Sequence, residues 1–456
     1  TCIITKGADS VLDMSPALLL SAAVICVIIT VFFTRRPKKT LLLGIFKAAR
    51  QIIPAYPLLL LIGMLSSTWM LSGVVPYMIN VGMGVLNPTV FLPTACIICA
   101  VISVVTGSSW TTIATVGVAL MGIGTLMDYD NAWIAGAIIS GAYFGDKISP
   151  LSDTTILASS TIGVKLMTHI RSLMITTMPA MILALCGFTM VGFLSSNSSE
   201  ISDPGLMEAL SSTFNLSPWL MLVPLATLLL IMMRVPTLIV MVIASVAGLV
   251  VMFIAQPHIV AQLTSLNGSD LATALNVTFT STALSTGNET LDALAATSGM
   301  EGMLPTIKLI SCAMIFGGVM IGSGMLTTLT SSFIKRLRKP GSMIGATVAT
   351  GLFLNSFTGD QYISIIIGGN LFRTPYRMGG YKPQVLSRTL EDSISVTSVL
   401  IPWNSCGMTQ STVLSVSTLS YLPCCLFNIL SPLMSIVVAK VAHKFNYRLY
   451  TLKPTV

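Results

Sequence analysis

The sequence predicts an all-α polytopic membrane protein with inverted-topology repeats, re-entrant hairpins and broken transmembrane helices. The composition predicts a membrane protein, because 54% of the 456 residues are hydrophobic and only 9% are charged. A soluble domain carries roughly 25% charged residues. So few ionisable side chains cannot cover a protein of 48.3 kDa with a polar surface. The composition therefore excludes a water-soluble enzyme, a disordered chain and a nucleic-acid-binding domain.

Apolar runs of about 20 residues are needed to cross the hydrocarbon core of a bilayer. Nine such runs are predicted as full spans: 14–33, 51–71, 132–164, 172–194, 218–233, 236–255, 306–333, 392–420 and 422–439. Two further apolar stretches, 89–125 and 343–370, are each interrupted by a polar sequence that contains glycine. A single span would bury that sequence against lipid, so each stretch is predicted to be a pair of half-helices.

Basic residues predict the orientation, because cytoplasmic loops carry an excess of Lys and Arg. They cluster at 35–50, 165–171, 335–339, 373–388 and 440–453. The loops at 126–131, 195–217 and 257–302 are poor in Lys and Arg and are predicted to face outward. The first hairpin then enters from outside and the second from the cytoplasm. The chain begins at Thr1 rather than Met, which is compatible with a missing N-terminal piece.

The two halves of the chain share a pattern of breaks. Thr106-Gly107-Ser108 matches Thr358-Gly359-Asp360 at an offset of 252, and Pro150 matches Pro402 at the same offset. Asp146 matches Asp392 at an offset of 246, which predicts a six-residue insertion in the second copy. Two such units in opposite orientation are typical of transporters that bind substrate near the membrane midplane. The predicted organisation is an N-terminal span with a basic cytoplasmic loop (1–50), repeat 1 (51–194), connecting spans and external loops (195–305), repeat 2 (306–439) and a cytoplasmic tail (440–456).

Five acidic side chains fall inside the broken elements, and they are Asp146, Asp153, Asp360, Glu391 and Asp392. An ionised group at membrane depth costs at least about 2.5–3.5 kcal/mol, so such groups are kept for function or are paired. Proline at each break frees backbone carbonyl oxygens, and hydroxyl and amide side chains flank both breaks. Oxygen ligands of this kind suit a small, hard cation.

The candidate cation- or proton-binding residues are Asp153, Asp146, Asp360, Asp392, Glu391, Ser152, Thr154, Asn404, Ser405, Thr106, Ser108 and Thr358. The candidate helix breaks are Pro150, Pro402, Gly107 and Gly359. The preferred Na⁺ site consists of Asp153, Ser152, Thr154 and Asn404. Burial disfavours the charged form of a carboxyl group, so a shared carboxyl would hold either a proton or a cation, which gives obligatory exchange.

Each acidic residue also has a structural interpretation. Asp153 would cap the helix that resumes after the first break. Asp360 would accept backbone N–H bonds at the hairpin tip, and Asp146 would pair with Lys147 at the membrane interface.

The second broken span has its own alternative, in which Arg388 is the ion partner of Glu391 and Asp392 at the start of a helix. An enzyme is not expected, because the histidines are too scattered to build a nucleophile–His–acid set; they are His169, His258 and His443. A channel is disfavoured, because hairpins and acidic broken helices suit alternating access better than an open pore.

Four segments resemble the NhaC-type Na⁺/H⁺ antiporters of the ion-transporter superfamily: TGSSWTT (106–112), GAIISGAYFGDKISPLSDTT (136–155), FTGDQY (357–362) and LSRTLEDSISVTSVLIPWNSCG (386–407). The resemblance covers about residues 40–440. It implies a multi-pass protein of a bacterial inner membrane that exchanges cytoplasmic Na⁺, Li⁺ or K⁺ for external H⁺, and the basic residues at 440–453 predict a cytoplasmic C-terminus. It further implies a lipid bilayer and monovalent cations as partners, no cofactor, no nucleic acid and a homodimer.

The resemblance leaves the substrate open, because related carriers exchange organic acids such as malate and lactate. The alternative is therefore a Na⁺- or H⁺-coupled transporter of an organic acid or amino acid. The family pattern usually reads SPLSDTTNLA, whereas Ile156 replaces its Asn here, which removes an oxygen ligand or a capping group.

Overall fold

The computed structural model describes residues 8–34, 38–195, 204–233, 235–286, 288, 291–292, 295–326, 328 and 340–444. The first half contains α2 (Ala8–Ile29), α3 (Lys38–Ile52), α4 (Ala55–Leu71), α5 (Val74–Val85), α6 (Phe91–Thr106), α7 (Ser109–Thr112), α8 (Val118–Leu126), α9 (Asn131–Ile148), α10 (Asp153–Ile162) and α11 (Leu166–Ser195). The middle contains α12 (Pro204–Thr213), α13 (Leu222–Met232), α14 (Thr237–Ala255), α15 (Pro257–Asn267) and α16 (Asp270–Phe279). The second half contains α18 (Leu304–Gly322), α20 (Pro340–Thr358), α21 (Gln361–Met378), α22 (Pro383–Leu390), α23 (Ser405–Leu414), α24 (Thr418–Tyr421) and α25 (Leu426–Lys444).

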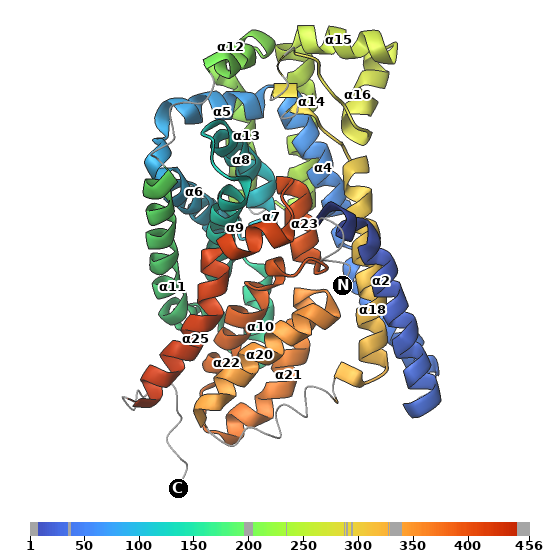
Figure 1. Cartoon of the computed structure of the whole chain (residues 1–456), viewed down its shortest axis with the longest axis vertical. Coiled ribbons are helices and arrows are strands. Elements are labelled where there is room, and N and C mark those ends of the chain that lie inside the picture. Colours follow the sequence, from blue (N-terminus) through green and yellow to red (C-terminus); the bar gives the residue numbers. More distant parts are fainter. Residues whose placement is uncertain are drawn as a thin grey trace.

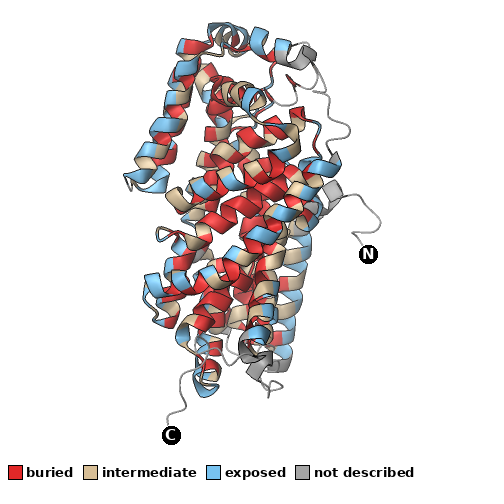
Figure 2. Ribbon diagram, turned by 90° about the vertical axis from the view of Figure 1, so that its left-hand side faces the viewer, coloured by how far each residue is buried: buried red, intermediate tan, exposed pale blue. Residues whose placement is uncertain are grey.

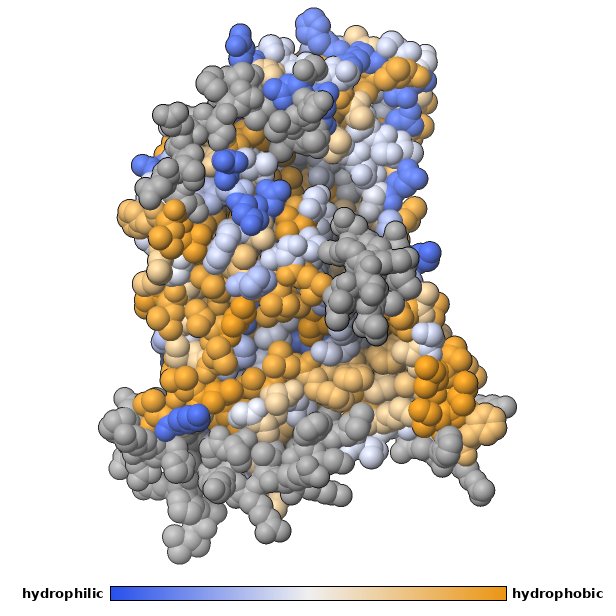
Figure 3. All heavy atoms as spheres, viewed as in Figure 1, coloured by the Kyte–Doolittle hydropathy of each residue, from blue (hydrophilic) through white to orange (hydrophobic). Residues whose placement is uncertain are grey.

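Several helices are long and apolar enough to cross a bilayer. Six such segments lie in the described ranges: Lys39–Leu71, Pro88–Thr106, Ser109–Leu126, Leu166–Leu194, Thr237–Ala255 and Glu301–Gly322. Thr418–Cys424 and Leu426–Val441 form a further pair that is bent by 56°. On the face shown in Figure 3, apolar side chains form a broad belt, and polar side chains gather at the upper end over α15 and α16. The protein is therefore an all-α polytopic membrane protein, as the composition predicts.

The expected spans differ from the observed helices in several places. The spans at 132–164 and 392–420 are broken into shorter helices near Pro150 and Pro402, as expected. The second of them begins earlier than expected, because α22 starts at Pro383. The apolar helix α5 was not expected, and α12, α15 and α16 lie in stretches that were predicted as outward-facing loops. These three short helices cover the upper end of the molecule in Figure 1.

The bounds of the helices repeat at one fixed interval. The starts of α7, α9, α10 and α11 recur 252 positions later as the starts of α21, α22, α23 and α24, and the ends of α6 and α8 recur as those of α20 and α21. The predicted six-residue insertion is therefore wrong, and the position that matches Asp146 is Ser398. Asp392 matches Ser140 instead, on the middle of α9.

The two hairpin tips have the same local structure. Gly107 and Gly359 have φ values of +68° and +69°, a left-handed conformation that favours glycine. The backbone N–H of the next residue donates to the preceding threonine, at 3.3 Å for Thr106 and 3.2 Å for Thr358. The residue after each glycine then caps the returning helix. A short polar sequence thus separates the two helices of each hairpin while keeping its backbone groups hydrogen-bonded. The helices before and after Gly107 are each long enough to cross a bilayer, so the half-helices expected at 89–125 stay a prediction.

The two hairpins approach the middle of the molecule from opposite ends. In Figure 1 the hairpin of α6 with α7 and α8 lies in the upper half, and that of α20 with α21 lies in the lower half. Each tip packs on the break of its own half. A Cβ on Gly107 would lie 2.6 Å from the Leu151 side chain, and one on Gly359 would lie 3.5 Å from the Trp403 carbonyl oxygen. Figure 2 shows that most of the buried residues lie in this middle region.

Glycines allow the first hairpin to pack closely on the first broken helix. A Cβ on Gly141 of α9 would lie 2.0 Å from the backbone oxygen of Cys96 on α6. A Cβ on Gly145, one turn later, would lie 2.3 Å from the Ala100 oxygen. Small residues permit this kind of close helix contact in membranes.

Substituting Gly141 with alanine is therefore expected to destabilise the protein. Because the added methyl group meets backbone rather than a movable side chain, α6 and α9 must separate, which costs about 1–3 kcal/mol. The melting temperature of the purified protein in detergent would fall. Gly84→Ala in α5 is the matched control, because nothing lies within 4 Å of its added Cβ. An equal loss in both variants would contradict the proposed close contact.

Candidate functional site

A cavity of about 500 Å³, called the central cavity below, lies where both hairpin tips meet the first helix break. The tips contribute Thr106, Gly107, Ser108, Ser109, Trp110, Asp360, Gln361 and Tyr362, and the breaks contribute Asp146, Leu151, Asp153, Thr154 and Ser405. The cavity continues between the start of α4, the start of α14 and α10, at Pro54, Leu58, Leu157, Thr237 and Leu238. Side chains about 250 positions apart in the chain therefore share one chamber.

Three of the five predicted acidic residues line the central cavity. Asp146 accepts hydrogen bonds from the backbone N–H of Ser109 at 3.2 Å and from its hydroxyl at 2.7 Å. Asp360 is buried and caps α21 by accepting the backbone N–H of Ile363 at 2.9 Å. Its structural interpretation is thus confirmed, although the side chain also faces the cavity. Asp153 is exposed in the first turn of α10 and is not its cap, because Ser152 takes that role.

Four of the predicted hydroxyl residues also line the central cavity, and they are Thr106, Ser108, Thr154 and Ser405. Three other predicted residues lie outside its wall and hold helix ends. Ser152 accepts the backbone N–H of Thr155 at 3.4 Å. Asn404 accepts the N–H of Cys406 at 3.1 Å and donates to the Asn355 carbonyl at 3.2 Å. Thr358 donates to the backbone oxygen of Asp360 at 2.9 Å.

The preferred four-residue Na⁺ set is therefore not assembled around the cavity. Asp153 and Thr154 line it, whereas Ser152 and Asn404 use their oxygens to cap α10 and α23. Ile156, the departure from the family pattern, is exposed and is not among the lining residues.

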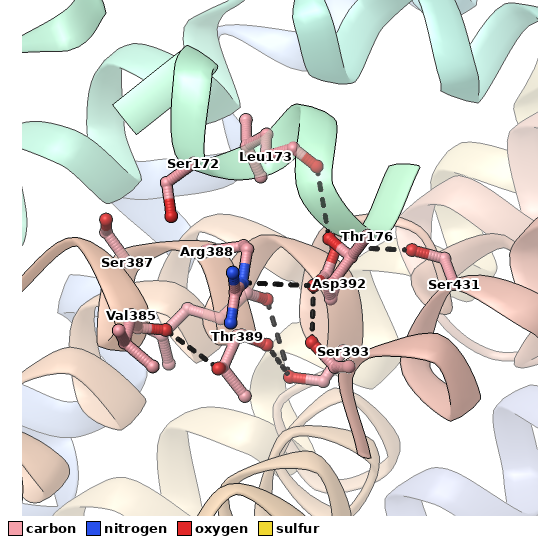
Figure 4. A network of polar contacts seen from close by, with 12 residues as sticks. Ser172, Leu173, Thr176, Val385, Ser387, Arg388, Thr389, Asp392, Ser393 and Ser431 are labelled. Atoms are coloured by element: carbon pink, nitrogen blue, oxygen red, sulfur yellow. Dashed lines mark hydrogen bonds and ion pairs between the residues drawn. The ribbon is translucent and has the colours of Figure 1, made fainter. Parts of the chain in front are cut away.

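Asp392 lies away from the cavity in a fully buried polar cluster. Its carboxylate forms an ion pair with Lys147 of α9 and accepts hydrogen bonds from Thr176, Ser431 and Ser435. The Arg388 Nε atom lies 4.0 Å away, as the sequence alternative expected. Figure 4 shows Thr176 and Ser431 directed at this carboxylate from two sides. The expected interfacial pair of Asp146 with Lys147 is wrong, because Lys147 points to the other half of the chain.

Glu391 occupies the π-helical turn Glu391–Ser395 that follows α22. Its side chain is fully buried, and neither carboxyl oxygen has a hydrogen-bond partner among the described residues. It borders a small cavity of about 10 Å³ together with Asp146, Lys147, Thr154 and Gln361. That volume is about the minimum that holds one water molecule. Because Asp146 and Thr154 line both cavities, Glu391 lies one small chamber away from the central cavity.

Sequence reasoning missed several lining residues: Ser109, Trp110, Gln361 and Tyr362. They directly follow the two tips at matching positions, so extending the 252-residue match by two positions would have found them. The same pair of matched positions is hydrogen-bonded in both halves, with donor and acceptor reversed. Ser109 donates to Asp146 at 2.7 Å, while Ser398, which matches Asp146, donates to the amide oxygen of Gln361 at 3.2 Å.

The charge of the central cavity is one-sided. Three carboxyl groups line it, and none of its described lining residues is Lys or Arg. Within the ranges that the structure describes, no three His, Cys, Asp or Glu side chains are close enough together to hold a metal ion. The carboxyl groups are thus spread around the wall among hydroxyl groups. Such a lining attracts cations without enclosing them in a permanent chelate.

Comparison with known proteins finds similarity to cation antiporters. The model of the "Na+/H+ antiporter family" matches residues 70–161 and 141–442. The Na⁺/H⁺ antiporter NhaC of Alkalihalophilus pseudofirmus is 36% identical over 83% of this chain and 80% of its own length. The Na⁺/H⁺ antiporter NhaC of Bacillus subtilis is 32% identical over 89% of this chain and 88% of its own. The malate-2H⁺/Na⁺-lactate antiporter of Bacillus subtilis is 33% identical over 81% and 77%.

Proposed function

Because the chain belongs to the Na⁺/H⁺ antiporter family, we propose that it is a secondary antiporter that exchanges cytoplasmic Na⁺, Li⁺ or K⁺ for external H⁺ by alternating access. The central cavity is the observation that carries the proposal, because Asp146, Asp153 and Asp360 line it without a basic side chain among its described lining residues. The field of such a lining favours cations and opposes organic anions. The substrates are Na⁺ and H⁺, and the proposal requires no cofactor.

The cation binds in the central cavity to carboxylate and hydroxyl oxygens, with Asp146, Asp153, Thr154 and Ser405 as its candidate ligands. Residues 51–194 and 306–439 are the two units that move relative to each other to alternate access. The protein resides in a bacterial inner membrane with its C-terminus in the cytoplasm, since the basic loops lie on that side under the positive-inside rule. A homodimer is part of the proposal, and the mass of the purified protein in detergent tests it.

Glu391 is the candidate proton-binding residue. A buried ionised carboxylate without hydrogen-bond partners is very costly, whereas the protonated acid avoids that cost. The small cavity that Glu391 shares with Asp146 gives a proton a path to the central cavity through a single water-sized space. Cation and proton would then bind to neighbouring carboxyl groups whose charges influence each other.

Glu391→Gln is expected to uncouple Na⁺ from H⁺. Glutamine keeps the shape of the side chain and fixes it in a neutral form, so the fold should remain stable within about 1 kcal/mol. Exchange of ²²Na⁺ for Na⁺ would continue in proteoliposomes, while Na⁺-driven proton movement would fall to background. Glu391→Asp, which keeps a titratable group, should retain part of the coupling. Normal proton movement in Glu391→Gln would exclude Glu391 as the proton-binding residue.

A cation series in proteoliposomes tests the function itself. An imposed Na⁺ gradient is expected to drive proton movement that a pH-sensitive dye inside the vesicles reports, with Li⁺ and K⁺ as parallel arms. Empty liposomes give the background. If none of the imposed cation gradients drove proton movement, the antiport proposal would be refuted.

Transport of an organic acid is the second candidate. The similarity to a malate–lactate antiporter and a cavity volume of about 500 Å³, far more than Na⁺ needs, favour it. The acidic lining disfavours it, because Lys147 is engaged with Asp392 outside the cavity. Counterflow of radiolabelled malate or lactate in the same liposomes distinguishes the two candidates.

A further inference from the structure

A second polar cavity, of about 350 Å³, lies between the start of α18 and α23, and Pro16 of α2 also lines it. Six of its lining residues are polar: Thr306, Lys308, Ser411, Thr412, Ser415 and Ser417. Exposing such a surface to lipid would be costly, so this cavity suits contact with water. It is called the outer cavity below, because it lies beyond the end of α23 that is distant from the central cavity.

The outer cavity is built from the elements that match one wall of the central cavity. α18 matches α4 at an interval of 251, since the glycines after the two helices, Gly73 and Gly324, are both left-handed. The serine before each glycine also caps its helix in the same way, with its hydroxyl 3.1 Å and 3.0 Å from a backbone oxygen three residues earlier. At this interval, Pro305, Thr306 and Leu309 of the outer cavity match three residues of the central cavity: Pro54, Ala55 and Leu58.

The opposite wall is formed by the matching helix of each half, at different positions along that helix. The outer cavity is lined by Met408, Ser411 and Thr412 of α23, and the central cavity is lined by Asp153, Thr154 and Leu157 of α10. α10 and α23 have equal lengths and start 252 positions apart. Each half therefore forms a polar chamber between its broken helix and the helix before its hairpin.

The two chambers differ at the contact between their walls. In the second half, the hydroxyls of Thr306 and Thr412 are hydrogen-bonded at 2.6 Å and join α18 to α23. In the first half, the position of Thr306 is Ala55, which has no hydroxyl group, so this bond has no counterpart. The side chain of Met408 is buried below the bond, one turn of α23 from Ser405 on the central cavity.

We propose that the outer cavity is the external vestibule of the transport path, through which hydrated monovalent cations pass on the side of the membrane opposite the basic loops. The Thr306–Thr412 hydrogen bond and Met408 separate it from the central cavity in this conformation. The external route opens when α18 and α23 part, as α4 and α10 already do in the first half. Lys308, which is exposed at the vestibule, repels entering cations and sets their apparent affinity on that side. The assignment rests on the proposed function. The experiment below tests the position of the cavity and the proposed function by separate measurements.

Cysteine labelling of the full chain in oriented proteoliposomes tests the vestibule. Ser411→Cys is expected to react with a membrane-impermeant, positively charged thiol reagent added opposite the C-terminus, and the reaction should block Na⁺-driven proton movement. Ser265→Cys on α15 is the matched control, because Ser265 is exposed and α15 lies at the upper end of the molecule in Figure 1, so its labelling should leave exchange unchanged. The parent protein with its native cysteines gives the baseline. Thr412→Val in the Ser411→Cys background should speed labelling, because it removes the bond that joins α18 to α23.

Two results would overturn the assignment. One is a Ser411→Cys protein that labels only from the C-terminal side or does not label, and the other is one that labels fully while exchange continues. If the parent protein moved no protons in response to Na⁺, the proposed function would fail, and the side from which Ser411→Cys labels would still decide whether the cavity opens to the external water.

Lys308 supplies a test that needs no labelling. Lys308→Gln is expected to lower the half-saturating external Na⁺ concentration by about threefold at low ionic strength, while Lys308→Arg leaves it unchanged. The difference should shrink as salt rises, because the Debye length falls from about 30 Å at 0.01 M to about 10 Å at 0.1 M. Equal affinities for all three proteins at low ionic strength would remove Lys308 from the path.

Discussion

Asp392→Asn is expected to lower the free energy of unfolding by about 3–5 kcal/mol, because it leaves the ammonium group of Lys147 buried without its counter-charge. Both side chains are almost completely inaccessible to solvent, at 1% for Lys147 and 0% for Asp392. Thermal unfolding in detergent, followed by fluorescence-detected size exclusion, measures the loss. Glu208→Gln on the exposed surface of α12 serves as the control and should change little.

The partner substitution should be milder. In Lys147→Met, Asp392 keeps the nearby Arg388 and the hydroxyl groups of Thr176, Ser431 and Ser435. The double variant should recover part of the loss of Asp392→Asn, since it leaves neither of these two charges buried alone. If the double variant lost more unfolding free energy than the sum of the losses in the two single variants, the ion pair would not account for the effect.

Asp360→Asn is expected to lower Na⁺-driven proton movement without unfolding the protein. Asparagine caps helices as well as aspartate does, so the start of α21 should keep its bond to Ile363. The substitution removes one negative charge from the central cavity and leaves its volume nearly unchanged. Transport in proteoliposomes and a melting curve on the same preparation separate the two effects.

Asp146→Asn with Asp153→Asn is the companion variant, because it removes the other two charges from the same chamber. Asp128→Asn is the matched control: Asp128 is exposed outside the cavity, and its φ of +58° suits asparagine. Normal exchange in both the Asp360→Asn and the double variant would exclude the central cavity as the cation site.

The sequence predicts the class of fold well, because its strongest signals are physical. A charged fraction of 9% excludes a soluble surface, and a polar sequence with glycine inside an apolar run requires a reversal of the chain. Proline inside a helix kinks or breaks it, so Pro150 and Pro402 mark the two breaks. Hence the hairpins, both breaks and three of the acidic residues on the central cavity could be located from residue types alone.

The pairing of side chains could not be located in the same way. The contact of Lys147 with Asp392 joins residues 245 positions apart, and neither residue carries a local sign of its partner. The false match of Asp146 with Asp392 arose because similar residues follow both. In the structure, Asp146 lies in the last turn of the regular helix α9, which ends at Ile148. Asp392 lies in the π-helical turn Glu391–Ser395 that follows α22, so the two residues occupy different places in their halves.

Ser152 and Asn404 show a second limit. Each offers an oxygen at a helix break. Such an oxygen can bind a cation or cap the next helix, and the residue type does not distinguish these two uses. Both oxygens cap the next helix, because unpaired backbone N–H groups at a helix start are costly inside the protein. The residues that follow the caps, Asp153 and Ser405, line the central cavity and belong to the proposed cation site.

The constant interval of 252 positions from α6 to α24 has a consequence for how this chain tolerates changes of length. One residue added within α10 would rotate every later side chain of that helix by about 100° and shift the contacts it shares with the second half. The helices α12, α15 and α16 lie between the two halves and outside the repeated interval, whereas α14 in the same stretch packs on α4 and lines the central cavity. Natural length variation, and any epitope or fluorescent domain inserted for imaging, therefore belongs in the turns beside α12, α15 and α16.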